Sequence, residues 1–254
     1  MAGPWLVAWH PRPAERPLLV CLPPAGAGCV QFRAWQHALG DAVAVAGVQL
    51  PGRETRWSDP PAESMDAAVA AIAAEVAALV PADHPIVVFG HSFGALIGWE
   101  LVRTLRRERG QRVEALVVAA CKPPDRWVGA GRGLVEDDDE LATLLDTRGL
   151  GADDLDEDTR ELMLAVLRHD ARLSMSFTGA GLAPLDVPLE AWVAEADPTV
   201  PPADMTDWRR YAGAGFTARR FPGGHYFCLD DPAPVLPILA ARARDAVATK
   251  GTIG

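Results

Sequence analysis

A serine stands in a glycine-flanked turn at Phe89 to Ala95, which reads F-G-H-S-F-G-A. This G-x-S-x-G motif follows the apolar run Pro85 to Phe89 and precedes a helical pattern, so it joins a buried strand to a helix. Gly90 and Gly94 leave room for neighbouring backbone to pack against a sharp, strained turn. The pattern predicts that Ser92 is a nucleophile, held at the carboxyl edge of a sheet and ready to attack a carbonyl carbon.

A serine hydroxyl is a poor nucleophile at neutral pH, so it needs a base, and the base needs an orienting acid. Of six histidines, His225 has the fitting context, because it lies in the glycine-rich segment Phe221 to Phe227 between the last expected strand and the last helix. The other histidines, at positions 10, 37, 84, 91 and 169, have weak contexts. His91 adjoins Ser92, but we expect its side chain to leave the turn in another direction.

The acid should follow a strand between the serine and the histidine. Asp197 does so, after the run Leu189 to Glu195 and 28 residues before His225. This gives the chain order Ser, Asp, His that such serine turns use. The same aspartate is also placed to open an Asx turn before Pro198, and the two roles are compatible. Asp125, one strand earlier, is the alternative acid.

Acyl transfer also requires hydrogen-bond donors for a negatively charged oxygen. We expect the backbone N–H of Phe93, the residue after the nucleophile, to be one donor. The second should come from the loop after the strand Leu18 to Leu22, which reads P-P-A-G-A-G over residues 23–28. Pro24 has no N–H, whereas Ala25 and Gly26 each have one, and small residues there let the backbone approach a substrate oxygen closely. We therefore predict Ala25 as the second donor.

Short apolar runs alternate with helical patterns, which indicates an α/β fold with a mostly parallel sheet flanked by helices. Expected strands are Leu18 to Leu22, Val43 to Leu50, Ile86 to Phe89, Ala115 to Ala120, Leu189 to Glu195 and Phe216 to Phe221, with Trp5 to His10 as an antiparallel edge strand. Expected helices are Phe32 to Leu39, Ser64 to Val80, Ala95 to Arg107 and Pro232 to Ala246. Ser64 is a good N-cap.

One stretch, about residues 123–188, breaks this alternation because no convincing strand occurs in it. It holds an acidic run from Glu136 to Glu140, helical pieces near Leu141 to Leu145 and Thr159 to Arg168, and a loop-like segment at 149–155. An insertion of this size at the carboxyl edge of a sheet predicts a lid over the site. We treat residues 1–254 as a single domain with this insertion.

Composition limits the class of protein. The chain has 254 residues, 49% of them hydrophobic, which suffices for one large α/β domain. A formal charge of −10 argues against non-specific nucleic-acid binding. The chain start lacks a secretory signal pattern, no apolar stretch is long enough to span a bilayer, and the four cysteines form no C-x-x-C pair. We expect a cytoplasmic monomer with reduced thiols, no metal and no phosphate-binding loop.

Several segments, in order along nearly the whole chain, resemble one family, the type II thioesterases of polyketide and non-ribosomal peptide assembly lines, which have the α/β-hydrolase fold. They are L-P-P-A-G at Leu22, Q-L-P-G-R-E ending at Glu54, G-H-S-F-G-A at Gly90, V-L-R-H-D ending at Asp170, the Asp197-Pro198 context and P-G-G-H-Y-F ending at Phe227. The elements P-G-R-E and G-G-H-Y-F are more specific than the serine motif. The chain departs from the family pattern at Pro24, Ala27 and Ala171.

The resemblance implies hydrolysis of acyl groups from the phosphopantetheine thiol of acyl or peptidyl carrier proteins, which clears stalled or aberrant units. It implies a triad of Ser92, Asp197 and His225, a mobile lid that forms an acyl chamber, and no cofactor beyond the phosphopantetheine of the substrate. Two alternatives stay open: a small-molecule carboxylesterase of the same fold, and a non-catalytic binding protein. Five arginines could contact an acidic carrier, or simply form solvated surface: Arg103, Arg106, Arg107, Arg209 and Arg210.

Overall fold

A seven-stranded sheet forms the centre of the computed structural model, which describes residues 3–128, 135, 138–146 and 155–248. The spatial order is β1-β3-β2-β4-β5-β6-β7, and every neighbouring pair is parallel except β1 with β3. The strands are β1 (Leu6–Ala8), β2 (Leu18–Leu22), β3 (Ala44–Val48), β4 (Ile86–His91), β5 (Val113–Ala119), β6 (Leu189–Ala194) and β7 (Phe216–Phe221). The edge strand near the start of the chain is antiparallel, as the sequence predicts.

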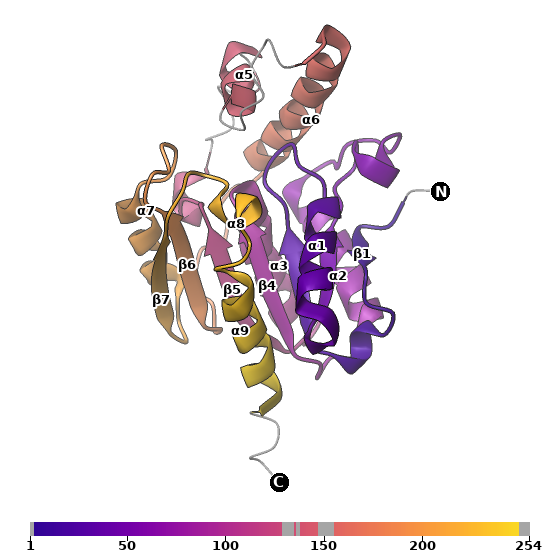
Figure 1. The fold of residues 1–254 in the computed structure, drawn as a ribbon, viewed down its shortest axis with the longest axis vertical. Coiled ribbons are helices and arrows are strands. Elements are labelled where there is room, and N and C mark those ends of the chain that lie inside the picture. The colour runs from indigo at the N-terminus through magenta and orange to yellow at the C-terminus, as the bar shows by residue number, and fades with distance from the viewer. Residues whose placement is uncertain (1–2, 129–134, 136–137, 147–154, 249–254) are drawn as a thin grey trace.

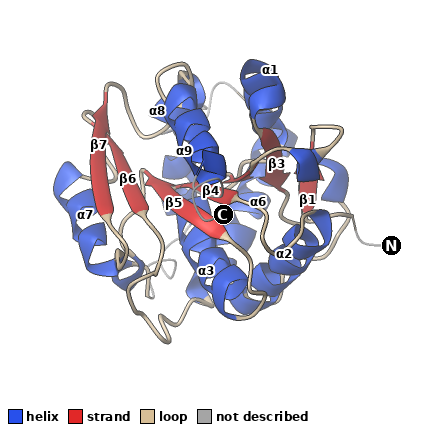
Figure 2. Ribbon diagram, turned by 90° about the horizontal axis from the view of Figure 1, so that it is seen from below, coloured by secondary structure: helices blue, strands red, loops and turns tan. Residues whose placement is uncertain are grey.

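Helices cover both faces of the sheet (Figure 1). Figure 2 shows α1 (Arg33–Leu39) and α9 (Leu236–Ala248) on one face, and α2 (Met65–Leu79) and α3 (Phe93–Arg107) on the other. Because side chains alternate along a strand, Leu19 of β2 packs under α1 and α9, whereas Leu18 packs with α2 and α3. All five residues of β2 are fully buried, as expected for a strand covered on both sides.

The expected elements are found with small shifts at their ends. The Ser64 hydroxyl accepts the N–H of Ala67 at 3.1 Å and so caps α2 as predicted. Short helices were missed, namely α7 (Pro202–Thr206) and α8 (Phe227–Asp230). Both are five residues or fewer, so they carry too little periodicity to be recognised in sequence. None of the helices among the described residues is apolar and long enough to cross a membrane.

The described part of the insertion between β5 and β6 contains helices joined by loops. It contains α5 (Asp138–Asp146) and α6 (Glu157–Met175), and no strand occurs among its described residues. Both helices lie above the carboxyl ends of the strands (Figure 1). The acidic run contributes the start of α5, while the loop predicted at 149–155 falls almost wholly outside the described residues. Helix α6 extends beyond its expected end, through residues 169–175.

The close packing of α3 against the end of β2 yields a stability prediction. A Cβ at Gly94 would collide with the carbonyl oxygens of Leu22 and Pro23, whereas one at Gly98, a turn later, would approach side-chain atoms no closer than 3.4 Å. Gly94→Ala should therefore destabilise the fold by about 2 kcal/mol or more, as overpacking does. Gly98→Ala should be neutral or stabilising by up to about 1 kcal/mol, because alanine favours helix. Urea denaturation of both variants checks this, and equal effects would contradict it.

Candidate active site

Ser92 occupies a strained turn between β4 and α3. Its backbone torsion φ is +52°, a value that residues other than glycine rarely adopt. The turn is held by two backbone hydrogen bonds: Ser92 N–H donates to the Ala119 carbonyl at 2.8 Å, and Ala95 N–H donates to the Ser92 carbonyl at 2.8 Å. A Cβ at Gly90 would collide with the backbone of Ala95. The geometry is therefore the strand–turn–helix arrangement that the motif predicts.

His225 and Asp197 meet although 28 residues separate them. The Nδ1 atom of His225 lies 2.8 Å from Oδ2 of Asp197, and both residues are 8% exposed. The other carboxylate oxygen, Oδ1, accepts the N–H groups of Thr199 at 2.8 Å and Val200 at 3.1 Å. Asp197 thus forms the predicted Asx turn and also contacts the imidazole of His225.

The Asp197 carboxyl stays ionised in this environment. Burial raises its pKa, but the hydrogen bond and charge of His225, with the N–H groups of Thr199 and Val200, outweigh burial and lower the pKa below its ordinary value. An ionised carboxylate accepts hydrogen bonds only, so Nδ1 of His225 carries the proton that faces it. The other ring nitrogen, Nε2, is then the atom available as a base.

Two aromatic rings support His225 in a way that the sequence did not reveal. The His91 ring packs edge-on against His225, with centroids 5.4 Å apart, and stacks on Tyr226 at 5.7 Å. His91 is fully buried at the end of β4. The contact of His91 with His225 depends on how the loops after β4 and β7 converge in space, which the sequence alone does not show.

The alternative acid, Asp125, lies elsewhere. Its carboxylate is 3.3 Å from Arg210 and 4.0 Å from Arg126. The contact with His225 is made by Asp197. The geometry therefore favours Asp197 as the orienting acid.

The loop that follows β2 forms a tight turn next to the serine. Ala27 N–H donates to the Pro24 carbonyl at 3.1 Å, and Gly26 has a φ of +71°. A positive φ at the third of four turn residues is typical of a type II turn, and glycine is favoured there. Ala25 is the second residue of that turn, and both it and Phe93 line the same cavity as Ser92.

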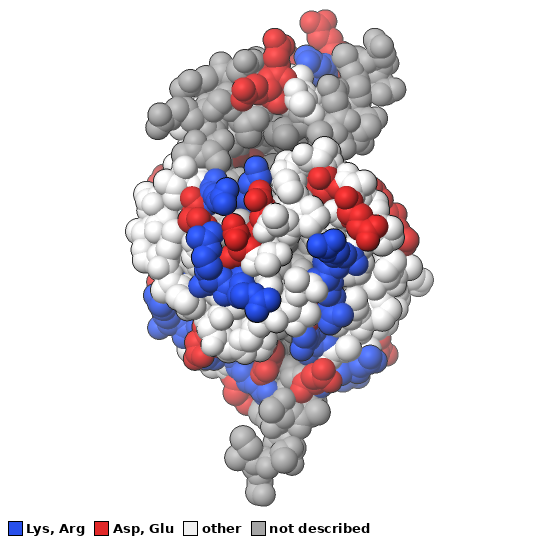
Figure 3. Space-filling view, turned by 90° about the vertical axis from the view of Figure 1, so that its left-hand side faces the viewer, with Lys and Arg blue, Asp and Glu red and all other residues white. Residues whose placement is uncertain are grey.

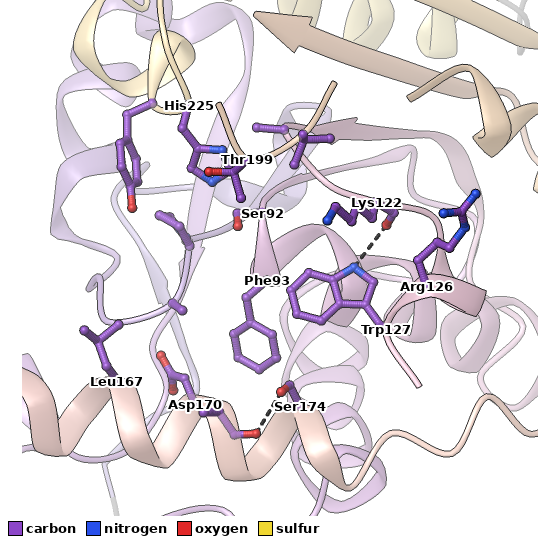
Figure 4. Close-up of a pocket in the computed structure, with 16 residues that line it drawn as sticks. Ser92, Phe93, Lys122, Arg126, Trp127, Leu167, Asp170, Ser174, Thr199 and His225 are labelled. Atoms are coloured by element: carbon purple, nitrogen blue, oxygen red, sulfur yellow. Dashed lines mark hydrogen bonds between the residues drawn. The ribbon is translucent and has the colours of Figure 1, made fainter. Parts of the chain in front are cut away.

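That cavity has a volume of about 230 Å³ and brings together the strand ends, the histidine loop and helix α6 (Figure 4). Ser92, His225 and Ala25 line one part, while the rings of Phe93 and Trp127, 6.2 Å apart, line another. Helix α6 contributes Leu167, Asp170, Ala171 and Ser174. Polar reactive groups therefore open onto a largely apolar chamber, which suits a substrate with a carbonyl and an apolar tail.

Cationic side chains also reach this cavity, from the segment that follows β5. Lys122 and Arg126 line it, and Arg126 pairs with Asp207 at 3.3 Å. Among the described residues, no group of three or more histidine, cysteine, aspartate or glutamate side chains could hold a metal ion.

The four cysteines do not compete as nucleophiles. All are free and buried. Burial raises the pKa of Cys121 to about 12 and raises those of Cys21, Cys29 and Cys228 as well, so the reactive thiolate is disfavoured. Ser92 is thus the nucleophile candidate in the cavity.

The five predicted docking arginines fall into two separate groups. Arg103 and Arg107 lie in the last two turns of α3, roughly 16–23 Å along its axis from Ser92. Arg103 pairs with Glu100 at 2.8 Å, and Arg106 lies 3.7 Å from Asp186.

The second group lies nearer the cavity. Arg210 is exposed and lies 3.6 Å from Asp207, the carboxylate that also pairs with the cavity-lining Arg126. Arg209 is exposed and covers the Phe216 ring at 5.1 Å. Figure 3 shows Lys and Arg interspersed with Asp and Glu on this side of the molecule. The structure therefore joins Arg210, but not the α3 group, to the rim of the cavity.

Comparison with known proteins gives a consistent family. Residues 17–242 match the model of the thioesterase domain. The chain is 32% identical to the thioesterase PikA5 of Streptomyces venezuelae, over 90% of this chain and 82% of PikA5. Among solved structures it is similar to RedJ, a thioesterase from the prodiginine pathway of Streptomyces coelicolor, with 34% identity, a TM-score of 0.81 and coverage of 91% and 92%. The type II thioesterase BorB, from the borrelidin cluster, has 28% identity, a TM-score of 0.82 and coverage of 96% and 99%.

The fold is the α/β-hydrolase fold, a mostly parallel sheet flanked by helices with a serine turn after a central strand. The chain belongs to the thioesterase family, and within it to the type II thioesterases of polyketide and non-ribosomal peptide pathways. It is therefore a hydrolase, as the sequence resemblance implies.

The lowered pKa of Asp197 predicts a pH-dependent contribution to stability. Because folding lowers this pKa, the contribution is fully present above the ordinary value of about 3.9 and is lost as the pH falls through the folded-state pKa. At pH 7 the free energy of unfolding of Asp197→Asn should be smaller than that of the original chain. Denaturant titrations from pH 7 to 3 should show this difference closing below about pH 4. Asp186→Asn, whose side chain is 91% exposed, is the control and should show little difference at any pH.

Proposed function

We propose that this thioesterase hydrolyses acyl groups from the phosphopantetheine thioester of acyl or peptidyl carrier proteins, and so removes stalled or aberrant units. The observation that carries the proposal is the hydrogen bond between Asp197 and His225, because His225 lines the same cavity as the strained Ser92. The free, buried cysteines suit a reducing compartment, so we place the activity in the cytoplasm.

In the first step, Ser92 Oγ attacks the thioester carbonyl carbon while His225 Nε2 accepts the hydroxyl proton. Asp197 keeps the imidazole in the required tautomer and stabilises the imidazolium that forms. The carbonyl oxygen becomes negatively charged and is stabilised by the N–H groups of Phe93 and Ala25. The carbon–sulfur bond then breaks, the thiolate takes the proton from His225, and the acyl group remains as an ester on Ser92.

In the second step, water replaces the thiol. His225 Nε2 accepts a proton from the water as its oxygen attacks the ester carbon, and the same two N–H groups stabilise the oxyanion. The bond to Ser92 breaks, His225 returns the proton to the serine oxygen, and a carboxylic acid leaves. Water is the only co-substrate of the complete reaction, and the products are the carboxylic acid and the free thiol.

The walls of the cavity support an acyl group as the bound part of the substrate. Phe93, Trp127 and Leu167 offer apolar surface beside the reactive serine. The exposed Arg210, joined to the cavity through Asp207 and Arg126, and the exposed Arg209 before it in sequence are the docking contacts we propose for an acidic carrier protein. Such contacts raise the rate of encounter more than the affinity, and they weaken with salt.

The central test is the removal of the nucleophile. Ser92→Ala should lower kcat for an acyl-carrier thioester by about 10⁴-fold or more and abolish labelling by a fluorophosphonate probe. The measurement is thiol release together with mass spectrometry of the acyl-enzyme. Ser64→Ala is the control, because loss of this helix cap should cost about 1 kcal/mol of stability without affecting acylation.

Undiminished acyl transfer by Ser92→Ala would refute the assignment of the nucleophile. Faster turnover of simple oxygen esters than of acyl-carrier thioesters would instead favour a small-molecule carboxylesterase. If the original chain does not react with the fluorophosphonate, a non-catalytic binding protein is favoured.

The lid side of the cavity predicts a change in chain-length preference. Ala171 lines the cavity one helical turn after Leu167, so a larger side chain there fills space that the acyl tail would occupy. Ala171→Leu should lower kcat/KM for octanoyl thioesters by about 10-fold or more and leave acetyl thioesters within about 3-fold. Ala165→Leu, on the same helix outside the cavity lining, is the control. Equal losses for both chain lengths would contradict the placement of the acyl tail.

A further inference from the structure

Two buried charges connect the lid to the loop beside the serine. Asp170 of α6 and Arg53 of the P-G-R-E segment are 3% and 6% exposed. They form a two-pronged ion pair, with Arg53 Nη1 at 2.8 Å from Asp170 Oδ2 and Nη2 at 2.5 Å from Oδ1. Such fork-to-fork pairs fix both the distance and the mutual orientation of their partners.

The same pair holds the turn at residues 24–27 from two sides. Asp170 Oδ2 accepts the Gly26 N–H at 2.7 Å, and Arg53 Nη1 donates to the Ala27 carbonyl at 3.1 Å. Arg53 is itself anchored, because its Nε donates to the Pro51 carbonyl at 3.3 Å. The turn therefore donates one hydrogen bond to helix α6 and accepts one from the segment after β3.

The hydrogen bond to Gly26 acts on the one peptide group whose direction distinguishes type II from type I turns. That group joins Ala25 to Gly26, and its rotation changes ψ of Ala25 and φ of Gly26. Asp170 accepts the Gly26 N–H while φ of Gly26 is +71°. Asp170 therefore favours the type II form and fixes ψ of Ala25, the torsion next to the peptide group that carries the Ala25 N–H.

Two neighbouring contacts support the same loop. The Glu54 carboxylate accepts the Val30 N–H at 2.8 Å and leaves no room for a Cβ at Gly28. Ala25 itself packs against the apolar cluster of the lid helices formed by Leu141, Leu145, Leu164 and Leu167. The position of the loop thus depends on contacts with α6 as well as on its own sequence.

We propose that Asp170 and Arg53 are positioning residues that orient the Ala25 N–H as an oxyanion donor, so that the lid helix helps to set the catalytic geometry. This inference rests on the proposed function, because it assumes that Ala25 stabilises the oxyanion. An oxyanion donor acts on the transition state rather than on the bound substrate. Disturbing it lowers kcat and leaves KM nearly unchanged.

The experiment compares Arg53→Lys and Asp170→Asn with Arg56→Lys. Arg56 is the matched control, because it is 3% exposed and pairs with Asp59 at 2.7 Å, yet it binds the Gln49 carbonyl instead of the 24–27 turn. Kinetics use butanoyl-N-acetylcysteamine, and an alkyl trifluoromethyl ketone serves as a probe that forms an oxyanion on Ser92. Thermal unfolding curves of all variants are measured first, and the kinetics are recorded at a temperature at which every variant is folded.

Arg53→Lys and Asp170→Asn should lower kcat by about 10- to 100-fold and change KM by no more than about 3-fold. The affinity of the trifluoromethyl ketone should fall in proportion to kcat. Arg56→Lys should lower the stability of the protein but leave kcat and the affinity for the ketone unchanged. An unchanged kcat in the first two variants, or an equal kcat loss in Arg56→Lys, would overturn the proposal.

If a single variant does not fold because a buried charge is left unpaired, the double variant Arg53→Met/Asp170→Leu replaces the pair by apolar side chains, a change that proteins often tolerate. It should show the same loss of kcat, and a kcat equal to that of the original chain would overturn the proposal. Ser92→Ala is assayed in parallel. Activity that persists in Ser92→Ala indicates failure of the proposed function itself, which separates the two failures.

Discussion

Close backbone packing around Ser92 is the constraint on which the site depends. The positive φ of Ser92 persists because the Ala119 carbonyl holds its N–H and because Gly90 and Gly94 have no Cβ to separate the neighbouring segments. Gly94 lies against the carbonyls of Leu22 and Pro23, at the end of β2 where the loop of Ala25 begins. The close contact between the end of β2 and α3 therefore brings the serine turn next to its expected oxyanion loop, and local strain is stored where chemistry needs it.

The three buried carboxylates among the described residues are compensated in the same manner. Asp197 is paired with His225 and two backbone N–H groups, and Asp170 with Arg53 and one backbone N–H. Glu190, 1% exposed in β6, pairs with Arg219 and Arg242 and accepts the Trp192 indole N–H. Each carboxylate joins segments distant in sequence, and a buried charge is tolerated because its hydrogen bonds are satisfied. These groups act as directional links more than as sources of net stability.

The sequence predicted the elements whose signals are local. Strand β2 and the serine turn follow from apolar runs and glycine spacing, and Asp197 and His225 follow from their places after strands. It did not predict that His91 packs against His225, because that contact depends on how two loops converge. Nor did it predict the ion pair of Arg53 with Asp170, which are 117 residues apart. Their motifs were recognised as family marks, but pairing between them has no periodicity and appears only in three dimensions.

Helix α6 combines two tasks that are usually assigned to different parts of an enzyme. Leu167 and Ala171 line the cavity where an acyl tail would lie, and Asp170, between them in sequence, holds the turn of Ala25. A tail that displaces the helix would therefore also displace Asp170 from the Gly26 N–H. On the proposal that Ala25 is the oxyanion donor, binding energy from a well-fitting acyl group is used to keep that donor in place, whereas a poorly fitting group loses that support. In such an arrangement selectivity is expressed in kcat as well as in KM, because the contacts that recognise the substrate also complete the catalytic geometry.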